Sequence, residues 1–204
     1  MLYVDVDALC KLAHWNILPL LPDVSGQQWK CIVTVSSLRY RASRAIKSPD
    51  RKLFYSSDAA KVACACISKM GFHSEIKFEV LPPLIDSPQI DPGEALLLSM
   101  TANDSQGIFL TGDKRALRAL SKLDCSTLFA GRVLIIEQVL AWCLHRQGRE
   151  WLLRNVCPFT HIDKAVSLIL GSQCDDSVES IKEGIFSYVD EIRRLHNPSF
   201  LVKL

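Results

Sequence analysis

A chain of 204 residues with 49% hydrophobic and 23% charged residues has the composition of a soluble globular protein with one sizeable core, or of a smaller domain with a helical extension. Its formal net charge of +2 is too small to mark a nucleic-acid-binding protein by charge alone. No stretch approaches the roughly 18 uninterrupted apolar residues of a membrane span, and the first residues lack the basic start of a signal peptide. We therefore expect a cytoplasmic protein with no membrane association.

The first ninety residues alternate between strand and helix patterns. Short apolar or β-branched strands are expected at residues 2–5 and 31–35. Helices are expected at 7–18, 36–46 and 57–70. Pro19 and Pro22 are expected to end the first helix, ahead of a loop at 23–26.

Residues 78–90 hold three prolines and predict an irregular connection. The run Asp91-Pro92-Gly93-Glu94 then predicts a helix start, with Asp at the N-cap, Pro at the first helical position and Glu at the third. Beyond the stop signal at 103–107, a strand is expected at 108–110 and a helix at 113–123.

The second half of the chain is helical in pattern. Helices are expected at 132–145, 149–156, 162–170 and 177–195, with a strand as an open alternative just before the first. The last helix places apolar residues on one face, namely Ile181, Ile185, Tyr188, Val189, Ile192 and Leu195. The whole pattern predicts an α/β domain over residues 1–140, with a parallel sheet flanked by helices, and an all-helical extension over 141–204 that packs on it or on a partner.

The eight cysteines stand singly in apolar runs except for Cys64 and Cys66, and no pair has CxxC spacing. We interpret them as small buried hydrophobic residues in a reducing compartment. Cys64 and Cys66 with His73 make a weak metal candidate, because side chains two positions apart on a helix diverge by roughly 200°. The five histidines lie in no recognisable motif, and each is expected on the surface or at a helix end.

Four acids, Asp5, Asp7, Glu94 and Asp113, stand where a strand gives way to a helix or where a helix begins. Such positions converge at the carboxyl ends of parallel strands. Converging carboxylates repel one another unless a hard cation such as Mg²⁺ or Mn²⁺ neutralises them. Taken singly, Asp7, Asp91 and Asp113 could be helix caps and Glu94 the reciprocal partner of a capping box. Asp5 resists this alternative because it ends an apolar strand, where a buried carboxylate is costly unless it is paired or binds a metal.

The order of these motifs resembles the PIN domain family of metal-dependent ribonucleases: an apolar strand ending in Asp5, then Gly93-Glu94-Ala95 before a helix, then Leu110-Thr111-Gly112-Asp113-Lys114 closing a later strand. The resemblance covers roughly residues 1–140. It implies an endoribonuclease, plausible as the toxin of a toxin–antitoxin pair, with Asp5, Glu94 and Asp113 as catalytic metal ligands and Asp7 as a further or alternate ligand. Many members carry a Glu just after the second strand, where this chain has Arg39, and we expect Arg39 near the acids.

Two basic clusters are candidates for binding RNA phosphates, although each could also be an ordinary solvated face. Their members are Arg39, Arg41, Arg44, Lys47, Arg51 and Lys52 in the first cluster, and Lys114, Arg115, Arg118 and Lys122 in the second. Tyr40 and Tyr55 could stack on unpaired bases. An antitoxin or other protein partner and a homodimer stay open.

Two further hypotheses belong to other classes. The first is a catalytically silent PIN-like module that binds RNA or a protein, given Arg39. The second is a phosphatase of the haloacid-dehalogenase type, because Asp5-Val6-Asp7 mimics the nucleophile motif of that family. The later motif of that family needs a second Asp four residues after Asp113, where this chain has Leu117.

Overall fold

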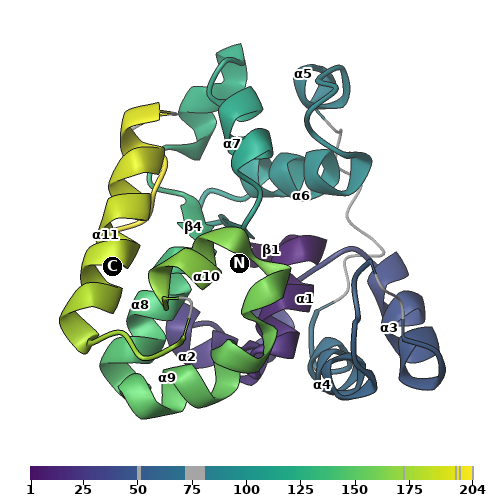
Figure 1. The fold of residues 1–204 in the computed structure, drawn as a ribbon. Helices are drawn as coiled ribbons and strands as arrows, with labels where there is room; N and C mark the ends of the chain where they lie inside the picture. Colours follow the sequence, from purple (N-terminus) through teal and green to yellow (C-terminus); the bar gives the residue numbers. More distant parts are fainter. Residues whose placement is uncertain (50–51, 72–80, 172, 196, 198, 204) are drawn as a thin grey trace.

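The computed structural model describes residues 1–49, 52–71, 81–171, 173–195, 197 and 199–203, and its centre is a parallel sheet wrapped by helices (Figure 1). The four strands run in the order β2-β1-β3-β4. Their bounds are β1 (Leu2–Val4), β2 (Ile32–Val33), β3 (Ile108–Thr111) and β4 (Val133–Ile135). The α/β class with a parallel sheet flanked by helices is confirmed.

Helices cover both sides of the sheet, as expected for short strands that are buried on both faces (Figure 1). Their bounds are α1 (Val6–His14), α2 (Leu21–Ser25), α3 (Ser37–Lys47), α4 (Ser57–Ile67), α5 (Pro82–Ile85), α6 (Pro92–Asn103), α7 (Lys114–Leu120), α8 (Ile136–Gln147), α9 (Arg149–Val156), α10 (Lys164–Ile169) and α11 (Val178–Leu195). Short 3₁₀ helices connect them: η1 (Leu18–Leu20), η2 (Trp29–Cys31), η3 (Asp124–Phe129) and η4 (Cys157–Ile162).

The first helix is shorter than the sequence pattern predicts. It ends at His14, and Asn16 then turns the chain with φ of 53°, a backbone conformation that Asn tolerates better than most residues. Pro19 and Pro22 lie at the starts of η1 and α2 rather than ending a helix, so the expected loop at 23–26 is mostly helical. A proline is accepted there because the first amides of a helix lack intrahelical partners.

The connection before α6 also holds more structure than expected. Pro82 and Pro83 begin the one-turn helix α5, and residues 72–80 lie outside the described part of the chain. The capping box at the start of α6 is confirmed: the Glu94 amide donates to Asp91 Oδ1 at 2.8 Å, and the Asp91 amide donates to Glu94 Oε2 at 2.9 Å.

The helical extension is continuous with the sheet. Residues 132–145, expected as one helix, contain β4 followed directly by α8, so the expected boundary at residue 140 falls within a helix. After α11 the chain returns to the sheet, where Leu201 pairs with Val133 and the Val202 amide donates to the Val133 carbonyl at 2.9 Å. The extension is therefore fastened to β4 at both of its ends.

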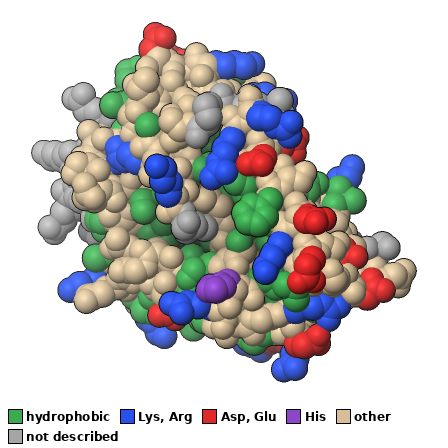
Figure 2. Space-filling model, turned by 90° about the vertical axis from the view of Figure 1, so that its left-hand side faces the viewer, with side chains coloured by type: hydrophobic (Ala, Val, Ile, Leu, Met, Phe, Trp, Pro, Cys, Tyr) green, Lys and Arg blue, Asp and Glu red, His purple; other side chains and the backbone are tan. Residues whose placement is uncertain are grey.

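The apolar face of α11 is buried, as predicted. Ile181, Ile185, Val189 and Ile192 are each at most 6% exposed, and α11 packs on α8 and α10. Figure 2 shows a face of the molecule on which charged side chains of both signs surround scattered hydrophobic ones. An apolar hollow of about 180 Å³ lies between α8 and α11, with Phe186 at its edge.

Truncating Ile185 to Ala is expected to lower the free energy of unfolding by about 2–5 kcal/mol, because the lost methyl groups leave a cavity between α11 and α8. Urea unfolding measures this loss, with Phe186→Ala as the control since that neighbouring side chain is 63% exposed. Unchanged stability together with loss of a dimer or partner complex would make this face an interface instead.

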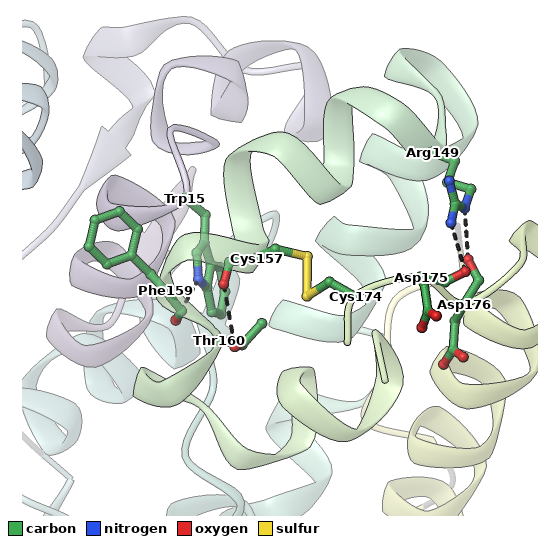
Figure 3. The surroundings of a disulfide bond; sticks show 8 residues. All are labelled: Trp15, Arg149, Cys157, Phe159, Thr160, Cys174, Asp175 and Asp176. Atoms are coloured by element: carbon green, nitrogen blue, oxygen red, sulfur yellow. Dashed lines mark hydrogen bonds between the residues drawn. A yellow bond between two sulfur atoms is a disulfide. The ribbon is translucent and has the colours of Figure 1, made fainter. Parts of the chain in front are cut away.

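One disulfide contradicts the expectation that all cysteines are unpaired thiols. Cys157 in η4 and Cys174 after α10 are bonded, although 17 residues separate them in sequence (Figure 3). The spacing of the two cysteines matches no motif. They come together because α10 lies between them in the chain and the segment after it folds back to η4. Arg149 fastens the same loop by donating to the carbonyls of Asp175 at 2.8 Å and Asp176 at 2.7 Å.

Within the described ranges, no helix combines the length and the apolar character needed to cross a membrane.

Candidate functional site

A cleft of about 600 Å³ opens at the carboxyl ends of β1 and β3, the position expected of a ligand site in a parallel sheet. We call it the acidic cleft. Among the described residues, its charged lining comprises five acids and three bases: Asp5, Asp7, Asp91, Glu94, Asp113, Lys11, Arg41 and Arg115. The four acids singled out from the sequence therefore lie around one cavity.

Asp5 is the least satisfied of these acids. It follows β1 and stands at the N-cap of α1, is 3% exposed, and its Oδ2 atom has no hydrogen-bond partner. Burial, and then the neighbouring Asp7, raise the pKa of Asp5 from 3.8 to about 7. The amides of Val6 and Ala8 oppose this shift, although neither makes a capping hydrogen bond of normal geometry.

Glu94 is equally hidden, at 3% exposed, on the first turn of α6. Burial raises its pKa from 4.5 to about 8; the hydrogen bond from the Asp91 amide opposes the shift, and the nearby charges of Asp5, Asp91 and Asp113 add to it. Glu94 thus caps its helix and also lines the cleft, so the capping role does not remove its carboxylate from the candidate site.

Asp113 is held in a different way. It caps α7 by accepting the Arg115 and Ala116 amides at 2.7 and 3.3 Å, and the Arg115 guanidinium lies 2.8 Å from its Oδ2. Burial alone would raise the pKa of Asp113, but its hydrogen bonds from Arg115 lower it. Arg115, predicted as a phosphate-binding residue, therefore pairs with an acid of the cleft.

The turn that carries Asp113 is tightly packed. A side chain at Gly112 would place its Cβ 2.5 Å from Ile136 Cδ1 and 3.6 Å from Asp7 Oδ2. The Asp113 amide donates to Thr111 Oγ1 at 3.0 Å, which fixes the turn after β3. The turn at Gly112 therefore packs closely against α1 and α8.

Asp7 is paired with Lys11, which was not among the residues predicted for the site. Lys11 Nζ lies 2.6 Å from Asp7 Oδ2 and 2.9 Å from Asp163 Oδ2. The i,i+4 spacing of Asp7 and Lys11 is a signal that could have been recognised. The second partner, Asp163 at the start of α10, lies too far along the chain for any local pattern to reveal.

The cleft has the donor chemistry for a hard cation, with carboxylate oxygens from β1, α6 and the β3–α7 turn. The orphaned Oδ2 atom of Asp5 is the observation that fits such an ion, since a buried carboxylate oxygen needs a positive partner. Within the described residues, no three acidic, histidine or cysteine side chains are gathered closely enough to hold one ion together. The pairs Asp113–Arg115 and Asp7–Lys11 account for two of the acids.

The predicted RNA-binding residues differ in whether they line the acidic cleft. Arg41 lines the acidic cleft and, with Arg44, an adjoining hollow of about 320 Å³ that we call the basic hollow. Arg39 and Arg118 are exposed but do not line the acidic cleft. The charge of Arg39 acts on the Cys64 thiol of α4, whereas Arg41 is the α3 cation that lines the cleft. The expectation that Arg39 lies near the acids stays a prediction.

Lys114 does not line the acidic cleft either. Its ammonium group lies 3.5 Å from Glu137 Oε1 and 3.9 Å from the centre of the Tyr188 ring. Glu137 is 4% exposed, and a carboxylate so buried needs a positive partner. Lys114 therefore links α7 to α8 and α11, and its role at phosphate stays a prediction. Arg51, another predicted cation, lies outside the described residues.

The weak cysteine site gains no support from its described members. Burial raises the thiol pKa of Cys66 to about 11 and also raises that of Cys64, which favours the protonated form over the metal-binding thiolate. His73, the third candidate, lies outside the described residues.

Comparisons of the chain with protein-family models, with curated proteins and with solved structures gave no match.

Proposed function

We propose that the protein is a divalent-metal-dependent endoribonuclease of the PIN type, with Mg²⁺ or Mn²⁺ as its cofactor. The observation that carries the proposal is the Asp5 carboxylate, buried with an unpartnered oxygen in a cleft that it shares with Glu94. The order of the acids along the chain supports the PIN assignment. A role as the toxin of a toxin–antitoxin pair, with an antitoxin as protein partner, belongs to the same proposal.

Asp5 and Glu94 would hold the cation, with Asp113 as the third carboxylate at the cleft. A bound divalent ion lowers the pKa of a water molecule and stabilises charge that develops on a phosphate. The chain itself keeps the two buried acids in place through β1 and the α6 capping box. The Arg115 side chain is exposed and lines the acidic cleft, so its guanidinium group can leave Asp113 and bind an anionic ligand instead.

The RNA backbone would enter past α3. Arg41 lines both the acidic cleft and the basic hollow, so a phosphate in the hollow would lie next to the carboxylates. Tyr40 on the same helix is 79% exposed and presents a ring on which an unpaired base could stack. These features favour a single-stranded substrate.

Glu94→Gln is expected to lower Mn²⁺-dependent cleavage of single-stranded RNA at least a hundredfold, because the amide keeps the capping hydrogen bond but removes a metal-binding charge. The measurement is a gel assay of cleavage with Mn²⁺ and with EDTA, and Glu179→Gln on the exposed side of α11 is the control. Full activity in Glu94→Gln, or cleavage that persists in EDTA, would contradict the proposal.

A catalytically silent RNA-binding module is the second candidate. The ion pairs of Lys11 with Asp7 and of Arg115 with Asp113 favour it, because they already neutralise two acids of the cleft. RNA binding with no cleavage at any Mn²⁺ concentration would select this alternative.

A further inference from the structure

Lys11 places a permanent positive charge in the acidic cleft. Its side chain is 15% exposed and lines the same cavity as Asp5 and Glu94. The ammonium group lies 2.6 Å from Asp7 and 2.9 Å from Asp163, so it is shared between an acid of the cleft and an acid of the helical extension.

This lysine is fixed from two directions. Asp7 lies one turn earlier on α1, and Asp163 belongs to α10. Asp163 Oδ1 accepts the Val166 amide at 3.1 Å and so caps α10, while its Oδ2 binds Lys11. The Lys11 ammonium group can move out of the cleft only if both Asp7 and Asp163 lose this ion-pair partner. Burial opposes the charge, but the two carboxylates raise the pKa of Lys11.

The charge of Lys11 changes which ions the cleft can accept. A carboxylate already bound to an ammonium group is a poor ligand for a divalent ion, and a positive charge beside it repels such an ion. Asp5, by contrast, has an unpartnered oxygen, and Glu94 is buried close enough for the charge of Asp5 to act on it. The Asp5 carboxylate is therefore available to a cation, whereas the Asp7 carboxylate is already paired.

We propose that Lys11 takes the place of a second divalent ion. The cleft then binds a single Mg²⁺ or Mn²⁺ on the Asp5 and Glu94 side, and Asp7 is the counter-ion of Lys11 rather than a metal ligand. The helical extension takes part in the site, since Asp163 supplies the other contact that positions the ammonium group. This inference rests on the proposed function only for the presence of a cation site.

The test is the number of Mn²⁺ ions bound, measured by titration calorimetry and by electron paramagnetic resonance. The wild-type chain is expected to bind one ion with the spectrum of isolated Mn²⁺. Lys11→Met keeps the length of the side chain, removes its charge and frees Asp7, so it is expected to bind a second ion whose spins couple to those of the first. Lys11→Arg keeps the charge and is expected to bind one.

Lys114→Met is the matched control, because that lysine also pairs with a carboxylate but does not line the cleft, and its stoichiometry should equal that of the wild type. Two ions in the wild-type chain, two in Lys11→Arg, or one ion at unchanged affinity in Lys11→Met would each overturn the inference. Wild-type stoichiometry decides the matter even where Lys11→Met does not fold. RNA cleavage with two bound ions would leave the proposed function standing, whereas no Mn²⁺ binding and no cleavage would remove both.

Discussion

Replacing Asp5 with asparagine is expected to make the protein more stable at pH 8 while removing its Mn²⁺ binding. The Asp5 pKa is raised to about 7 in the folded chain, so the fold must hold an ionised, buried carboxylate at pH 8. A shift of this size corresponds to a cost on the order of 4 kcal/mol, taken as an upper limit. Asparagine fills the same space without the charge.

The pH dependence identifies the cause. Because the folded pKa of Asp5 exceeds the ordinary aspartate value of 3.8, the favourable contribution of the protonated group is fully present below pH 3.8 and is lost as the pH rises through about 7. Wild-type and Asp5→Asn proteins should therefore have similar melting temperatures near pH 4, and the variant should be higher at pH 8. Asp124→Asn, an exposed control, should show no such divergence. A variant less stable than the wild type at pH 8 would show that the Asp5 carboxylate is well paired.

Replacing Arg132 with methionine is expected to destabilise the fold by roughly 3–5 kcal/mol, because a partly buried cluster of four carbonyl groups loses its shared donor. The Arg132 guanidinium donates to the carbonyls of Gly107 and Leu128, each at 2.9 Å, and to those of Thr101 and Asp104. Thr101 lies in the last turn of α6, so Arg132 joins the end of that helix to the loop before β3 and to η3.

Urea unfolding of Arg132→Met measures this loss, and Arg146→Met, at an exposed position of α8, is the control. Arg132→Lys should recover only part of the stability, because an ammonium group lacks the planar fork that reaches several carbonyls at once. Equal stability of the lysine variant and the wild type would mean that charge, and not this geometry, is what the site needs.

Local signals in the sequence predicted the start of α6 and the face of α11, but they left a strand before α8 only as an open alternative and did not place β4. The Asp91-Pro92-Gly93-Glu94 run specifies a capping box through contacts between near neighbours, and the structure has that box. Val133–Ile135 runs straight into α8 without a turn residue, so a strand and a helix looked like one apolar segment. Pairing with β3 decides that these residues are extended, and that contact is distant in sequence.

The same limit applies to the cleft. The positions of Asp5, Glu94 and Asp113 after strands or at helix starts were enough to predict that they lie around one cleft, because the geometry of a parallel sheet brings such ends to the same edge. What each acid pairs with was not predictable. The contact of Lys11 with Asp163, and the bond between Cys157 and Cys174, depend on how the extension folds back over the domain.

The strand order also constrains the route by which the chain folds. β1 is an interior strand, but one of its two neighbours, β3, comes more than a hundred residues later in the chain. During synthesis on the ribosome, the edge of β1 (Leu2–Val4) that pairs with β3 stays without its partner strand until Ile108–Thr111 has emerged. High contact order of this kind slows folding and leaves a hydrophobic strand edge open to other chains in the meantime. Chaperone capture of the nascent N-terminal half, and refolding that worsens as protein concentration rises, follow directly from this topology.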